Sequence, residues 1–102
     1  MSVREFAQAE LLTEKGKAVA AVRAVLTKST NPSGRTEWHG ALMPLSQDDA
    51  SKLLLVDQQA GYVFRAADGA EGKVTIKDRP VGATPESASV RVDVLGIGEP
   101  PF

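Results

Sequence analysis

The two residues best suited to acid–base chemistry are Glu37 and His39, which stand two positions apart in the segment Arg35 to Leu42. If this segment is a strand, both side chains lie on one face, where a carboxylate can orient an imidazole. Catalysis also needs a nucleophile, and no serine or threonine of the chain lies in a nucleophile motif. We therefore predict no catalytic residue and interpret the pair as part of a solvated strand face, with a minor enzymatic role as an alternative.

A second group of candidates consists of the cations around the centre of the chain, Arg65, Lys73, Lys77 and Arg79. Acidic residues lie between them, and the whole chain has 12 Lys and Arg against 13 Asp and Glu, for a net charge of −1. Nucleic-acid binders usually carry a basic excess or stripe, because phosphate contacts dominate their affinity. A mixed-charge solvated face is the favoured interpretation, and a small nucleic-acid-binding β-barrel is the alternative.

The sequence predicts neither a metal site nor a cofactor. It contains no cysteine, which excludes disulfides, thiolate nucleophiles and cysteine-ligated zinc. Asp48-Asp49 and Asp68-Gly69-Ala70-Glu71 lack the alternating ligands of a calcium loop. Gly96-Ile97-Gly98 begins like a dinucleotide-binding motif, but Pro100-Pro101 follows where a helix would have to start.

The two ends of the chain bear on partners and localisation. The first ten residues are acidic where a secretory signal needs an apolar core, and no apolar run approaches the ~20 residues that span a bilayer. We expect a soluble cytoplasmic protein with no membrane association. The chain ends in Pro-Pro-Phe, and Phe102 is a candidate anchor on another protein, although residues 96–102 are also typical of a flexible tail.

Several elements can be placed from the sequence. Alternating residues on both sides of Asp68-Gly69 predict a β-hairpin over Tyr62 to Ile76. A strand from about Ala18 to Ser29, the turn Asn31-Pro32-Ser33-Gly34 and a strand from Arg35 to Leu42 predict another hairpin, with Trp38 as its core anchor. Ser46 and the two aspartates that follow it favour the start of a short helix that ends before Gly61.

The remaining segments are less clearly defined. Ser2 and Glu5 resemble a capping box, whereas the β-branched residues further on favour strands, so residues 2–16 are predicted as either a short helix or a further strand. Residues 78–86 are too rich in Pro and Gly to be regular, and Ser89 to Leu95 alternate as a last strand.

Together these patterns predict a single domain over residues 1–102, mainly β, built as a small antiparallel β-barrel or compact sandwich of five or six strands with one short helix. An α+β fold, with an N-terminal helix on an antiparallel sheet, is the alternative. The favoured function is a non-enzymatic binding or assembly module that acts through protein–protein contacts at a sheet edge or at its termini. The partner is expected to be a protein, either a different chain or a second copy in a homo-oligomer.

Overall fold

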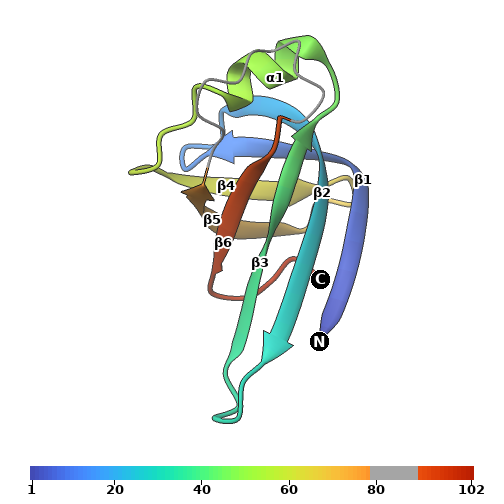
Figure 1. The fold of residues 1–102 in the computed structure, drawn as a ribbon, viewed down its shortest axis with the longest axis vertical. Helices are drawn as coiled ribbons and strands as arrows, with labels where there is room; N and C mark the ends of the chain where they lie inside the picture. The colour runs from blue at the N-terminus through green and yellow to red at the C-terminus, as the bar shows by residue number, and fades with distance from the viewer. Residues whose placement is uncertain (79–89) are drawn as a thin grey trace.

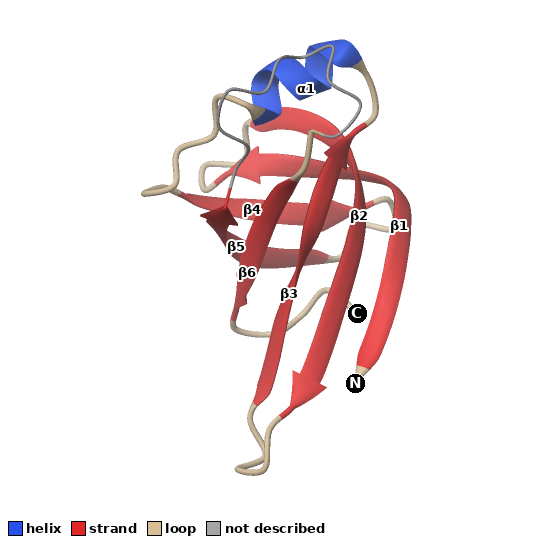
Figure 2. Cartoon of the chain, viewed as in Figure 1, coloured by secondary structure: helices blue, strands red, loops and turns tan. Residues whose placement is uncertain are grey.

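The computed structural model describes residues 1–78 and 90–102, and it has a closed barrel of six antiparallel strands with one short helix (Figure 1, Figure 2). Around the barrel the strands follow the order β1-β2-β3-β6-β5-β4, and β4 pairs with β1 to close it. The prediction of a small antiparallel barrel with one short helix is confirmed. The elements are β1 (Ser2–Thr13), β2 (Ala18–Thr30), β3 (Thr36–Pro44), α1 (Gln47–Leu53), β4 (Gly61–Ala66), β5 (Glu71–Asp78) and β6 (Val92–Ile97).

The barrel consists of two three-stranded meanders, β1–β3 and β4–β6, with α1 between them in the chain. Two seams join the meanders, one between β1 and β4 and the other between β3 and β6. The β4–β5 hairpin is the one that the sequence predicts. Its turn is closed by the Ala66 N–H, which donates to the Ala70 carbonyl at 2.8 Å, and Gly69 adopts the positive φ of +93° that the turn needs.

The sequence leaves helix and strand open for residues 2–16, and the structure has strand β1 there, so the α+β alternative is wrong. A β-bulge in β1 hides the two-residue period of a strand. Between Phe6 and Ala9 the register with β2 shifts, so that these two residues both point into the barrel although they are three positions apart. A second shift between Leu11 and Leu12 buries two neighbouring residues, which further hides the two-residue period of a strand.

The core fills the barrel with alternate side chains of all six strands. Val22, Ala24 and Leu26 of β2 are fully buried on one face, as predicted from their alternation. Trp38 is 3% exposed, which confirms it as a core anchor. Helix α1 lies across one end of the barrel and buries Ala50 and Leu53 there (Figure 1). No helix within the described residues is long and apolar enough to cross a membrane.

At the end of the barrel opposite α1, the first three strands continue beyond the other three (Figure 1). Among the described residues, β4 pairs with β1 only over Ala9–Thr13, and β6 pairs with β3 only over His39–Leu42. The pairing of β2 with β1 and β3, in contrast, runs on to Ser2 on one side and to Thr36 on the other. The result is a three-stranded extension of the barrel, here called the overhang, made of residues 2–6, 24–30 and 36–38. Because the described strands do not close the barrel around it, the overhang has two edges with no pairing strand among residues 1–78 and 90–102, and these are called its free edges.

Two predictions from the sequence fall wholly or partly outside the described residues. Arg79 lies outside them, as does most of the predicted loop 78–86, of which only Asp78 is described, as the last residue of β5. Of the predicted last strand, Ser89 also lies outside, and β6 begins at Val92 and continues to Ile97. Its inward residues Val92 and Val94 are buried, and so is Val90 just before it, as the alternation predicts.

Candidate binding surface at the open end of the barrel

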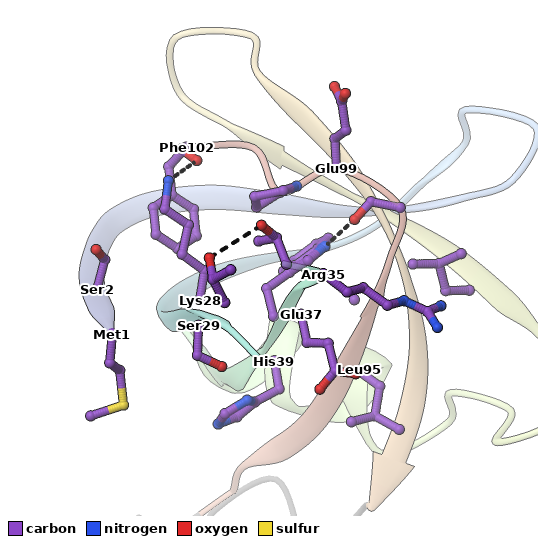
Figure 3. A pocket seen from close by; sticks show the side chains of 17 residues that line it. Met1, Ser2, Lys28, Ser29, Arg35, Glu37, His39, Leu95, Glu99 and Phe102 are labelled. Carbon is purple, nitrogen blue, oxygen red and sulfur yellow. Dashed lines mark hydrogen bonds between the residues drawn. The ribbon is translucent and has the colours of Figure 1, made fainter. Parts of the chain in front are cut away.

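A groove of about 1200 Å³ lies where β3 and β6 move apart, and Figure 3 shows it from close by. We call it the hairpin groove. It is lined by Met1, Ser2 and residues 28–30, 35–39, 95–100 and 102. The last pairs between β3 and β6 are His39 with Leu95 and Gly40 with Val94, and the space beyond them, toward the hairpin tip, is the groove.

One rim of the groove is the tip of the β2–β3 hairpin, which Asn31 holds in a fixed shape. The Asn31 Oδ1 accepts the backbone N–H groups of Ser33 and Arg35 at 3.1 and 3.0 Å, and the Asn31 N–H donates to the Arg35 carbonyl at 2.9 Å. Gly34 has the positive φ, +84°, of the last turn position. The predicted turn is thereby confirmed, and the β3 edge starts from an ordered tip.

The inner wall of the groove is the indole of Trp38. Its ring lies over the backbone of β5 and β6 where both strands carry glycine: a Cβ on Gly72 would come within 2.8 Å of the ring, and a Cβ on Gly96 would overlap it. The indole Nε1–H donates to the Gly98 carbonyl at 3.0 Å. Two glycines inside strands are the sequence signal for such a close approach, although they do not name the residue that makes it.

The tail, residues 98–102, continues along this wall and ends beside β2. The Lys28 Nζ donates to the Phe102 carbonyl oxygen at 2.8 Å and lies 4.9 Å from the centre of the Phe102 ring. The same ring meets Phe6 edge to face at 5.9 Å. The predicted flexibility of residues 96–102 stays a prediction, but the structure places Gly96 and Ile97 in β6 and gives the tail specific contacts.

Glu37 and His39 lie on the outward face of β3, on the side of the groove away from the inward-facing Trp38 ring. They share that face as predicted, and both side chains are exposed. His39 is paired in register with Thr27 on one side and Leu95 on the other. No hydrogen bond joins Glu37 to His39 in the described part of the chain, so the two residues line one surface without forming an acid–base pair.

Of the four predicted cations the structure describes Arg65, Lys73 and Lys77, and these three differ in their surroundings. Arg65 forms an ion pair with Glu71 across the β4–β5 hairpin, its Nε 2.6 Å from the carboxylate. Lys73 lies on the outward face of β5, in register with Ile97. Lys77 lines a separate hollow of about 490 Å³, together with His39. Of the seven surface candidates, the hairpin groove therefore brings together Glu37, His39 and Phe102.

The residues that sequence reasoning missed are Phe6, Lys28 and the glycines under Trp38. Nothing in the local pattern distinguishes Lys28 from the other lysines, because its role depends on a tail more than seventy positions away. Within the described residues, no group of three or more His, Asp or Glu side chains lies close enough together to hold a metal ion. Comparison with protein-family models, with curated proteins and with solved structures finds no match to this chain.

Proposed function

We propose that this protein is a non-enzymatic binding module that takes up an extended segment of a partner protein at the β3 edge of the overhang. The observation that carries the proposal is the free β3 edge, Thr36–Trp38, beside a groove of about 1200 Å³. A free edge presents backbone N–H and C=O groups to an added strand, and the adjoining groove gives room for its side chains.

The groove also offers the apolar contacts that such a segment needs. Leu95 and Ile97 both line it from the outward face of β6 and are 43% and 50% exposed. Alternate residues of an added strand point to opposite faces, so one set would reach these two side chains. An extended segment with apolar residues at every second position fits this arrangement.

The other free edge, Ser2–Phe6 of β1, is less favourable. The hollow beside it has a volume of about 470 Å³, and both neighbouring strand residues Arg4 and Glu5 are charged and exposed. Charged side chains on an edge discourage strand addition, but the β3 edge also carries exposed Arg35 and Glu37, so the smaller hollow is what distinguishes the β1 edge. The β1 edge therefore serves as an internal comparison for the β3 edge.

The test is a selection from a display library of eight-residue segments that alternate apolar and polar residues, followed by amide NMR on the full chain. Selected peptides should shift the amide signals of residues 35–39 and 95–98. Ile97→Asp should weaken their binding about tenfold, equivalent to about 1.4 kcal/mol, because it puts a carboxylate against the apolar side of the groove.

The matched control is Val3→Asp, which adds the same charge at a residue that is 60% exposed, beside the β1 edge. This variant should leave binding within about twofold of the wild type. Equal losses in the two variants, or signals that shift mainly along residues 3–6, would refute a site at the β3 edge. Multi-angle light scattering on the purified protein reports whether a second copy supplies the segment.

A further inference from the structure

The tail and the surface on which it lies have the features of a peptide and its binding site. Phe102 is held by three different kinds of contact, an edge-to-face contact with Phe6, a cation over its ring and a hydrogen bond from Lys28 to its carbonyl oxygen. Four positions earlier, the Gly98 carbonyl accepts the N–H of Trp38 at 3.0 Å. The surface thus contacts both ends of a five-residue segment, and we call it the tail slot, defined by Phe6, Lys28, Trp38 and Gly72.

The middle of the segment fits the slot through its prolines. A Cβ added to Gly72 would come within 3.0 Å of Pro101, so this glycine leaves room for the proline as well as for the indole. Proline has a fixed φ and no backbone N–H, which makes a Pro-Pro segment extended before it binds and lowers the entropy lost on binding. An aromatic residue after two prolines therefore reaches Phe6 at a low conformational cost.

The slot continues into the core through aromatic rings in edge-to-face contact. Phe6 contacts Phe102 on one side and Phe64 on the other, where the ring centres are 5.2 Å apart and the planes lie at 74°. Phe64 is fully buried at the centre of the barrel. Contact with the buried Phe64 ring therefore holds the Phe6 ring in place, and an aromatic residue in the slot meets a preformed surface.

The barrel does not depend on the tail for its closure. All six strand pairings are made by residues up to Ile97, and Gly98 leaves the strand with a positive φ of +73°. Phe102 and Pro101 are only half-buried, so both remain partly accessible to solvent in the slot. The tail can therefore leave its slot without breaking a strand pairing.

We propose that the tail slot is a recognition site for a partner's extended segment that contains Pro-Pro-aromatic, and that the chain's own tail occupies it as an intramolecular competitor. The main-chain oxygen of the partner's aromatic residue accepts the hydrogen bond from Lys28, and the ring of that aromatic residue takes the place of the Phe102 ring. This inference deepens the proposed function, because the slot forms the inner wall of the hairpin groove, but its test does not use the β3 edge.

The test uses the 102-residue chain with Phe102→Ala and, as the probe, the synthetic pentapeptide acetyl-Gly-Glu-Pro-Pro-Phe. Trp38, the only tryptophan, is the reporter because its indole contacts the tail. We expect saturable binding to Phe102→Ala with a change in tryptophan emission. The wild type should bind at least about tenfold more weakly, since its tethered tail has a high effective concentration. The same peptide ending in Ala should not bind, and Lys28→Met combined with Phe102→Ala should weaken binding of the Phe peptide.

Cooperative thermal unfolding shows whether Phe102→Ala is folded, and Phe102→Leu replaces it if it is not. A folded variant that does not bind the Phe peptide, or that binds the Ala peptide equally well, would overturn the proposal. A wild-type dimer that forms with rising concentration and disappears in Phe102→Ala would overturn the assignment to a different partner, because a second copy would then supply the segment. Failure of the pentapeptide leaves the results for Ile97→Asp and Val3→Asp unaffected, so the two proposals fail separately.

Discussion

At the scale of single residues, the structure depends on two glycines that have no side chain where the Trp38 ring lies. Trp38 is the only tryptophan, and its ring occupies space that side chains at Gly72 and Gly96 would take. The ring then provides one wall of the hairpin groove and donates a hydrogen bond to the tail. The absence of side chains at Gly72 and Gly96 thus allows both the burial of the indole and its contact with the tail.

Gly96→Ala tests this dependence. The new methyl group would overlap the indole and displace it, so we expect a loss of about 1–3 kcal/mol in the free energy of unfolding, typical of an overpacked interior. Chemical denaturation followed by tryptophan emission measures this change.

Gly61→Ala is the control, since the three atoms nearest to its methyl group would all belong to the flexible side chain of Glu14. It should lie within about 0.5 kcal/mol of the wild type if that side chain moves aside, as surface substitutions usually do. Equal stabilities for the two alanine variants would contradict the role of Gly96.

At the scale of elements, the short helix α1 is stabilised by contacts that join it to the sheet. Ser46 caps it as predicted, and its hydroxyl accepts the Asp49 N–H at 3.1 Å. The Asp49 carboxylate also accepts the backbone N–H of Ala21 in β2 at 3.0 Å. The capping role can be predicted from the sequence, because it depends on four consecutive residues. The bond to β2 cannot, because it depends on how the helix lies on the barrel.

Asp49→Ala should therefore cost about 1–3 kcal/mol of unfolding free energy, because it leaves the half-buried Ala21 N–H without its acceptor. Asp48→Ala removes the neighbouring carboxylate, which forms an exposed ion pair with Lys52 at 3.0 Å, and should cost less than about 0.5 kcal/mol. Thermal unfolding of both variants measures the difference. If Asp48→Ala proved the more harmful, the bond between α1 and β2 would not be what holds the helix in place.

The N-terminal strand shows why some elements could not be assigned. Its bulge places Phe6 and Ala9 on one face at a spacing of three, which is the spacing of a helix. Pairing with β2 and β4 is what makes this segment a strand, and those partners lie elsewhere in the sequence. The hairpin over β4 and β5 could be predicted because its turn and both of its strands are contiguous. Local signals thus predicted the local elements, and the candidate site remained hidden because the tail and Lys28 meet only after folding.

At the scale of the whole molecule, the structure combines a closed barrel with an open overhang. Strands in the barrel have neighbours on both sides, whereas the overhang ends at two free edges. Segments with fewer stabilising neighbours open locally at a lower free energy. The two parts of the molecule should therefore differ in how often their backbone hydrogen bonds break.

Amide hydrogen exchange measured by NMR tests this difference within single strands. Along β2, the amides of residues 20–23 should exchange at least about tenfold more slowly than those of residues 28–30. The comparison uses one strand, so its sequence neighbours and solvent conditions are shared. Uniform protection along β2 would show that the overhang is as stable as the barrel. It would then argue against the overhang as a surface that adapts to a partner.

The two seams of the barrel also bear on how the chain folds. The β1–β2, β2–β3 and β4–β5 pairings join strands that follow one another, and they close short loops. The seams are different, because each joins residues from opposite halves of the sequence, Ala9 with Ala66 and His39 with Leu95. Closing such long loops costs entropy before any contact is made, and non-local pairing slows folding. Once one seam has formed, the second closes within an already compact chain, so we expect the first encounter of the two meanders to limit the folding rate.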